Sequence, residues 1–331
     1  MRGWHLRRSP RVSTDCGAVA DIAFAYGQLV SSTSRPVADH QHRLSHHYRI
    51  SSGEGFRLNT IDPGSTDHAP ISDKQAAQAA LADGVERMAA LQDKLYAQDR
   101  WALLLVFQAM DAAGKDGTIK HVMSGVNPQG CQVTSFKAPS ALDLDHDFLW
   151  RCNRCLPERG RIGIFNRSYY EETLVVRVHP EMLARQSLPP ELVGKDIWQQ
   201  RYRDIHQYED YLSNNGVVIR KFFLHVSRKE QKKRFLERLD QPEKNWKFSL
   251  NDIKERAYWD DYMQAYEAMV RHTASKRAPW YVVPADNKWF TRLVVAAAVI
   301  DTLASLDLHY PTVNASMRAE LKMAREQLMA E

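Results

Sequence analysis

The sequence predicts an α/β protein in which a parallel sheet is covered by helices on both faces. From residue 101 onward, short apolar runs of strand length alternate with segments whose apolar residues recur at helical spacing. The first run, residues 101–107, is apolar throughout, as expected for a strand that is buried on both faces. No linker-like stretch interrupts this pattern up to residue 306, which favours one large domain.

The expected elements follow one another in a simple order. A long amphipathic helix over residues 72–95 comes first, with Asp73 near its start as a cap. Strands are predicted at 101–107, 132–136, 162–165, 217–226 and 280–283. Helices are predicted at 118–124, 141–154, 229–239, 250–275 and 289–306. We expect residues 1–47, which are rich in Ser, His and Arg without a sustained period, to be a disordered leader, and residues 312–331 to form a helical tail.

Composition narrows the class of protein. The 331 residues are 44% apolar and 26% charged, which excludes collagen-like, wholly disordered and disulfide-scaffold chains. The longest candidate for a membrane span, residues 293–300, is an apolar run of eight residues and is far too short. Four cysteines and the lack of an uninterrupted secretion-signal core favour a cytoplasmic location.

The net charge of +5 is distributed unevenly. Residues 1–12 carry four arginines and no acid, and residues 228–254 carry nine basic against five acidic residues. The rest of the chain is net negative. This distribution indicates an anionic ligand bound locally and argues against a nucleic-acid or membrane partner, which would call for positive charge over a whole face.

The loop after the first strand has a degenerate form of the phosphate-binding pattern G-x-x-x-x-G-K-[ST], the Walker A motif. Gly114 and Lys115 keep their spacing, whereas Ala109 replaces the first glycine, so the backbone there must avoid positive φ. Asp116 stands where a hydroxyl would bind a metal ion, and Asp111 inside the loop can replace that hydroxyl. Such a carboxylate can hold Mg²⁺ or accept a proton, both of which suit phosphoryl transfer. The structural alternative is a simple helix-capping turn.

A second group of polar residues follows the third strand. Arg167 stands at its carboxyl end, the edge at which open α/β sheets bind ligands, and an arginine there can stabilise phosphoryl charge. The alternative is an ion pair of Arg167 with Glu171 or Glu172 on a solvated turn.

The third group is the basic segment after the fourth strand. Arg234 and Arg238 are four residues apart and share a helix face, and Lys244 and Lys247 follow the turn at Pro242. Such a charge run is usually a solvated face. Because many nucleotide kinases carry a mobile lid at this place, a basic grip on a polyanion over residues 228–256 is the competing interpretation.

Taken in order, these segments closely resemble the polyphosphate kinase 2 family, most of all the branch that uses nucleoside mono- and diphosphates. The matching motifs lie at 109–120, 124–130, 135–139, 165–171, 234–247, 259–262 and 278–283, and the resemblance covers about residues 48–311. It implies a P-loop kinase-like three-layer α/β/α fold with a helical lid. It also implies a reversible, Mg²⁺-dependent transfer from inorganic polyphosphate to AMP and ADP, with Mn²⁺ as a substitute ion, by a homo-oligomer that also accepts guanine nucleotides.

The resemblance also implies a role for each matched residue. Asp111 would hold metal and align the nucleotide's terminal phosphate, while Lys115 and Arg167 would neutralise the transferring group. Substrate phosphates would be bound by Gly114, Asp116, Gly117, Thr118, Lys137, Asn166, Arg234, Arg238, Lys244 and Lys247.

Asn166 departs from the pattern, since other branches carry Asp there. It cannot be an anionic metal ligand, so metal binding would rest on Asp111 alone or be supported by Asn166 as a neutral ligand or by Glu171. The lost charge also predicts a relaxed acceptor site. Two other functions stay open: an ATP-dependent small-molecule kinase and a non-catalytic polyanion-binding module.

Overall fold

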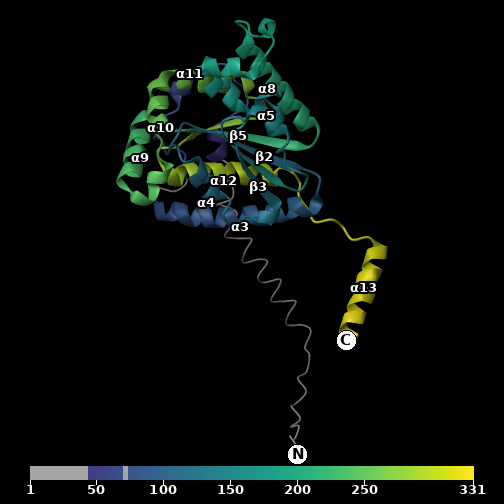
Figure 1. Cartoon of the computed structure of the whole chain (residues 1–331). Coiled ribbons are helices and arrows are strands. Elements are labelled where there is room, and N and C mark those ends of the chain that lie inside the picture. Colours follow the sequence, from purple (N-terminus) through teal and green to yellow (C-terminus); the bar gives the residue numbers. More distant parts are fainter. Residues whose placement is uncertain (1–43, 70–73) are drawn as a thin grey trace, which may run out of the picture.

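The computed structural model describes residues 44–69 and 74–331, and a six-stranded sheet lies at its centre, as Figure 1 shows. The strands lie in the order β1-β6-β5-β2-β4-β3. Their bounds are β1 Arg49–Ile50, β2 Ala102–Gln108, β3 Cys131–Ser135, β4 Ile162–Asn166, β5 Val217–His225 and β6 Trp280–Pro284. Strands β2 to β6 pair in parallel, and the short β1 adds to the edge antiparallel to β6. The five expected strands are confirmed to within one residue at each end, and β1 was not predicted.

Helices cover both faces of this sheet, which confirms the three-layer α/β/α class (Figure 1). One layer consists of α12 (Lys288–Ala304) and α4 (Lys115–Val122), with α3 (Lys74–Gln98) packed outside α12. The other contains α8 (Ile197–Asn214) and α11 (Trp259–Thr273), which contact each other, and α8 also packs on β5. Helix α12 is apolar on nearly all sides because it lies between the sheet and α3.

Three helical regions differ from the prediction. Residues 141–154 form two short helices, α5 (Ala141–Leu144) and α6 (Trp150–Asn153), because the Asp147 carboxylate accepts from Leu149 N at 2.9 Å and closes a turn between them. Residues 250–275 divide into α10 (Leu250–Glu255), η7 (Arg256–Tyr258) and α11. Helix α8 was not predicted, because its buried positions are spread among many polar residues.

The remaining elements are short or belong to the lid. The lid begins with α9 (Arg228–Asp240), which arches with α10 over one end of the sheet (Figure 1). The others are α7 Val175–Val178, η1 Leu58–Thr60, η2 Pro128–Gly130, η3 Tyr169–Thr173, η4 Pro180–Gln186, η5 Pro190–Leu192 and η6 Pro242–Lys247. No helix among the described residues is both long and apolar enough to cross a membrane.

The two ends of the described chain behave differently. Leu44 is buried and Ser45 Oγ donates to Asp301 Oδ2 at 2.6 Å, so packing begins inside the segment assigned to the leader. Residues 1–43, the rest of that segment, lie outside the described residues. Helix α13 (Ala315–Ala330) forms in the expected tail, is exposed along its length and extends away from the domain (Figure 1).

Candidate functional site

The loop between β2 and α4 has the geometry of a phosphate-binding loop. Gly114 lies at φ 105° and Ala112 at φ 63°, whereas Ala109 avoids positive φ, as the sequence required. Lys115 begins α4, and its Nζ donates to the carbonyl of Ala109 at 3.0 Å, across the loop. Burial, and next to it the charge of Arg167, lowers the pKa of Lys115. An anion placed here would meet the N-terminus of α4 and this ammonium together.

Arg234 holds the loop from the lid side. Its Nη1 donates to the carbonyls of Ala112 and Ala113 at 3.1 and 2.7 Å, and its Nε donates to Glu230 at 2.9 Å. Its Nη2 donates to the carbonyls of Ala285 and Asp286 at 2.7 and 2.9 Å. All five N–H donors of a guanidinium are thus used by the protein. Arg234 thus lies against the loop, as predicted, and braces its backbone. That it also contacts substrate phosphates stays a prediction.

Arg167 lies opposite the loop, at the end of β4. Its Nη2 donates to Asp111 Oδ1 at 3.1 Å, and its backbone N donates to the carbonyl of Phe107 at 3.0 Å. Neighbouring Glu171 raises the pKa of Arg167 most, which keeps the guanidinium charged. The alternative of an ion pair with Glu172 is wrong, because Glu172 is paired with Arg201 at 3.0 Å.

Glu171 lies half-buried near this arginine. Burial raises the pKa of Glu171, and the charges of Arg167 and Lys115 oppose that rise. In the amide orientation that satisfies both of its atoms, Gln108 donates to Glu171 Oε1 at 2.8 Å. The negative charge of Glu171 therefore interacts with both cations, and Glu171 lines a cavity on the side of Arg167 away from the loop.

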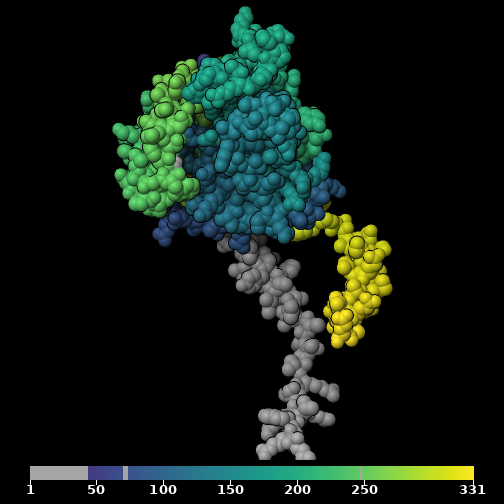
Figure 2. All heavy atoms as spheres, in the orientation of Figure 1, coloured from purple at the N-terminus to yellow at the C-terminus, as the bar shows by residue number. Residues whose placement is uncertain are grey.

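Seven basic residues line a cavity of about 550 Å³ between the loop and the lid, the loop cavity. They are Lys115, Lys137, Arg167, Arg234, Arg238, Lys244 and Lys288. Figure 2 shows a hollow at this place, between the green α9–α10 segment and the blue body. Lys288 was missed by sequence reasoning, although its position just after the sixth strand's carboxyl end was a usable signal.

Only some of the other residues that were expected to bind phosphate line the loop cavity. Gly114, Asp116, Gly117 and Asn166 line the loop cavity. Thr118 does not line it, because it is buried one turn into α4 at 4% exposure, and its contact with substrate phosphates stays a prediction. Lys247 lies in η6, and its side chain is outside the described part of the chain.

A second cavity, of about 390 Å³, lies on the other side of Asp111 and Arg167. Its wall carries Phe148, Tyr169, Tyr262 and Tyr266, and we call it the aromatic cavity. Asn251 and Asp252 of α10 reach it from the lid. Five residues line both cavities: Met110, Asp111, Lys137, Ala138 and Arg167. The two cavities therefore meet at the Asp111–Arg167 pair.

The oxygen donors at this junction fit a divalent cation that is shared with a phosphate. Among the described residues no group of three or more His, Cys, Asp or Glu side chains could hold a metal ion without help. Mg²⁺ usually takes one or two carboxylates and completes its shell with substrate phosphates and water, which suits Asp111 and Asp116. Asn166 Nδ2 donates to Asp116 Oδ1 at 2.7 Å, so the amide orients this carboxylate.

Comparison with known proteins places this geometry in one family. The sequence model described as "Polyphosphate kinase 2 (PPK2)" matches residues 71–310. The chain is 57% identical over 287 residues to the ADP-polyphosphate phosphotransferase of Rhodopseudomonas palustris, covering 85% of this chain and 97% of that protein. It is 45% identical over 264 residues to the AMP/ADP-polyphosphate phosphotransferase of Meiothermus ruber, covering 80% and 94%.

A solved structure agrees with these relatives. The crystal structure of polyphosphate kinase 2 from Arthrobacter aurescens matches with a TM-score of 0.78 and 40% sequence identity. The match covers 86% of this chain and 96% of that one. The fold, the order of the motifs and these likenesses agree, and the chain belongs to the polyphosphate kinase 2 family.

Proposed function

We propose that this enzyme transfers the terminal phosphoryl group of inorganic polyphosphate to AMP and to ADP, reversibly, giving ADP and ATP. The observation that carries the proposal is the junction of a basic cavity and an aromatic cavity at Asp111 and Arg167. The names of the relatives, which are phosphotransferases of ADP-polyphosphate and AMP/ADP-polyphosphate, support the same reaction.

The loop cavity suits polyphosphate. A chain of repeating anionic phosphates needs a line of cations rather than one deep pocket. Lys115 and the N-terminus of α4 lie in this cavity, and Lys288, Arg238 and Lys244 line it as well. Arg238 makes a 3.6 Å ion pair with Asp252, and its guanidinium lies 5.5 Å from the centre of the Phe235 ring, so it can turn to a phosphate without breaking a short hydrogen bond.

The aromatic cavity suits the nucleoside of the acceptor. Tyrosine and phenylalanine rings can contact the faces of a base, and the acidic and amide groups of α10 can bind polar edges. Such an acceptor would place its phosphates at the shared residues Asp111 and Arg167. Use of guanine nucleotides would then depend on the polar groups of this wall, and it stays a prediction, as do the homo-oligomeric state and the cytoplasmic location.

The chemical step needs little from the protein except position and charge. An oxygen of the acceptor's terminal phosphate attacks the last phosphorus of polyphosphate. A P–O bond forms to the acceptor as the bridging P–O bond breaks, and the shortened chain leaves with the electron pair. Lys115 and Arg167 stabilise charge on the transferring group from its two sides. Asp111, with Asp116 beside it, would hold the divalent cation, Mg²⁺ in this proposal, which when bound neutralises phosphate oxygens.

Asn166 bears on the choice of acceptor. Its amide bonds to Asp116 where an aspartate would bring a second negative charge against that carboxylate. With one charge fewer at the junction, an acceptor with two phosphates is repelled little more than one with a single phosphate. One site can therefore phosphorylate both, with about tenfold discrimination or less, roughly 1 kcal/mol.

The test incubates nucleotide-free enzyme with AMP, polyphosphate and Mg²⁺ and follows AMP, ADP and ATP over time by chromatography. ADP should appear first and ATP second, and GDP in place of AMP tests the base. Lys115→Ala enzyme prepared identically controls for contaminating adenylate kinase, and Asn166→Asp should widen the discrimination. ADP that accumulates without ATP would refute the dual acceptor. Turnover with ATP and a small molecule instead of polyphosphate, or binding without turnover, would refute the proposed reaction.

A further inference from the structure

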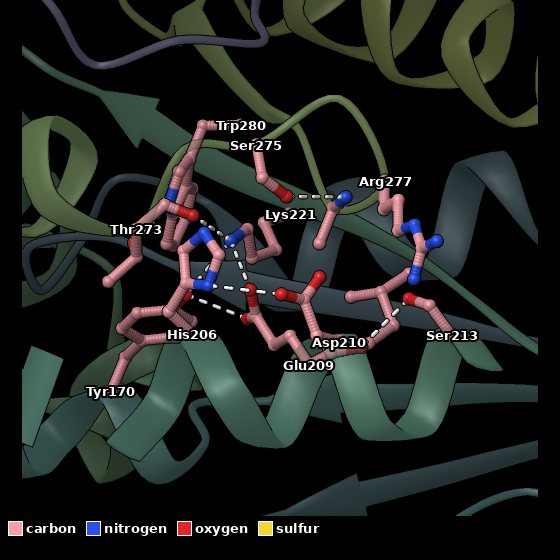
Figure 3. Close-up of polar contacts among 12 residues, drawn as sticks. Tyr170, His206, Glu209, Asp210, Ser213, Lys221, Thr273, Ser275, Arg277 and Trp280 are labelled. Carbon is pink, nitrogen blue, oxygen red and sulfur yellow. Dashed lines mark hydrogen bonds and ion pairs between the residues drawn. The ribbon is translucent and has the colours of Figure 1, made fainter. Parts of the chain in front are cut away.

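A buried ion pair lies behind the site, under the turn that carries Arg167. Lys221 points from the middle of β5 towards α8, and its Nζ donates to Glu209 Oε2 at 2.6 Å (Figure 3). Neither side chain is more than 2% exposed. No step of the proposed reaction uses either residue, because both lie outside the two cavities.

Every polar side-chain atom of this pair has a hydrogen-bond partner, and the partners come from several elements. Lys221 Nζ also donates to the carbonyl of Thr273 at 2.8 Å and to Tyr170 Oη at 3.0 Å. Glu209 Oε1 accepts from the hydroxyls of Tyr169 and Tyr170 at 2.9 and 2.7 Å. Strand β5, helix α8, η3 and the end of α11 are therefore tied at one point (Figure 3).

Such a pair needs a reason other than stability. Removing two charges from water is expensive, and well-packed apolar side chains often replace a buried ion pair without loss of stability. Burial lowers the pKa of Lys221, and the neighbouring Glu209 opposes that change. A role in fixing the positions of the residues that are hydrogen-bonded to it would explain why the pair is present.

Those partners are joined directly to Arg167. Tyr169 and Tyr170 follow it after the single residue Ser168, whose Oγ accepts from Tyr170 N at 3.2 Å. Arg167 itself lies at φ 65°, a left-handed conformation that costs an arginine about 1 kcal/mol or more and persists only where the surroundings enforce it. Tyr169 and Tyr170, fixed by their hydroxyls, hold one end of this strained turn, and β4 holds the other.

We propose that Lys221 and Glu209, acting through the hydroxyls of Tyr169 and Tyr170, are positioning residues that keep Arg167 in the conformation from which it reaches Asp111. The catalytic meaning of this placement rests on the proposed function. The placement itself does not, and it can be measured without turnover.

The test removes one hydroxyl and keeps the ring. In Tyr170→Phe, Glu209 loses one of its two phenol donors and Lys221 loses an acceptor, so the turn is held less firmly. We expect kcat for AMP with polyphosphate to fall about tenfold, because the contact of Arg167 with the transferring group is misplaced. Tyr208→Phe is the matched control, since the Tyr208 hydroxyl bonds to Asn153 and has no part in the cluster. It should behave as wild type.

Two further measurements separate positioning from a merely structural role. In an Arg167→Ala background, Tyr170→Phe should have no additional effect on kcat, whereas a general loss of folded enzyme would lower kcat by the same factor in both backgrounds. Hydrogen exchange of the peptide over residues 166–171 should speed up in Tyr170→Phe at an unchanged melting temperature. Additive kinetics or unchanged exchange would overturn the proposal. Wild-type enzyme inactive with polyphosphate, but with the exchange result as expected, would refute the proposed function and leave the positioning intact.

Discussion

The two halves of the lid use the same kind of residue in different ways. In the inner half, Arg234 gives all its donors to backbone carbonyls and Glu230, and Gln231 Nε2 donates to the carbonyl of Asp111 at 3.0 Å. In the outer half, one turn further along α9, Arg238 has a single long ion pair, and Lys244 is exposed. The inner half therefore builds the phosphate-binding loop, and the outer half is available to bind what enters it. A run of positive charge can be assigned only after the acceptors around each residue are known.

We expect the largest loss of activity from substitutions in the phosphate-binding loop itself, and the effects of substitutions in the two halves of the lid can be compared with it. Lys115→Ala and Asp111→Ala should each lower kcat at least about a hundredfold, because charge stabilisation dominates phosphoryl transfer. Asp111 binds Gln231 through its backbone carbonyl, so that contact survives the substitution. Circular dichroism and the melting temperature should show an intact fold. Activity close to wild type in either variant would remove the residue from the catalytic machinery.

The same substitution made in each half tests the comparison directly. Arg234→Met leaves three buried carbonyls and the part-buried carbonyl of Asp286 without their donor, so we expect a stability loss of about 3 kcal/mol or more, a lower melting temperature and a lower kcat. Arg238→Met, alone or with Lys244→Met, should keep the melting temperature and kcat, raise KM for polyphosphate several-fold and weaken its dependence on salt. Nucleotide KM should not change.

The halves would be indistinguishable if Arg234→Met raised KM for polyphosphate at an unchanged melting temperature. That result would place the Arg234 guanidinium on the substrate after all. A polyphosphate KM unaffected by the double substitution in the outer half would instead show that the lid does not bind the chain.

Much of this fold follows from local pattern, and much of the site does not. The buried parallel strands were predictable because strands such as β4 are apolar on both faces, and Gly114 and Lys115 because a phosphate-binding loop fixes their spacing. The role of Arg234 depends on carbonyls that lie far from it in the sequence, including that of Asp286. No spacing rule could have assigned it.

The Lys221–Glu209 ion pair and helix α8 were also not predicted from the sequence. Helix α8 carries Glu209 among its buried positions, and its sequence is so rich in polar residues that it was not recognised as a helix, although it is amphipathic. The usable signal was Lys221, a charged residue that follows Arg220 in the middle of a central strand and requires a partner if it is buried. The aromatic wall was missed in the same way, because Tyr262 and Tyr266 are separated by one helical turn and resemble ordinary core positions.

His225, a buried basic residue close to the start of the lid, differs from Lys221 in that it is uncharged. His225 ends β5, two residues before Ser227, which caps α9 by accepting from Glu230 N at 3.0 Å. It is 6% exposed, and its Nδ1 has no hydrogen-bond partner in the described residues. Burial lowers its pKa to about 4, so this imidazole is neutral where Lys221, four residues earlier, keeps a carboxylate partner.

The smallest expected effect follows from that lowered pKa. Above pH 6.5 the imidazole is neutral in both states and costs nothing. As the pH falls from 6.5 towards 4, the unfolded chain binds a proton that the folded protein does not bind, so stability falls with acid. Between pH 7.5 and 5.5 this loss amounts to about 1.3 kcal/mol. Denaturant unfolding of wild type and of His225→Gln at both pH values measures it: the acid-induced loss should be smaller by that amount in the variant. An equal loss in the two proteins would mean that His225 is protonated in the folded protein in spite of its burial, through the charges of Asp286 and Asp62.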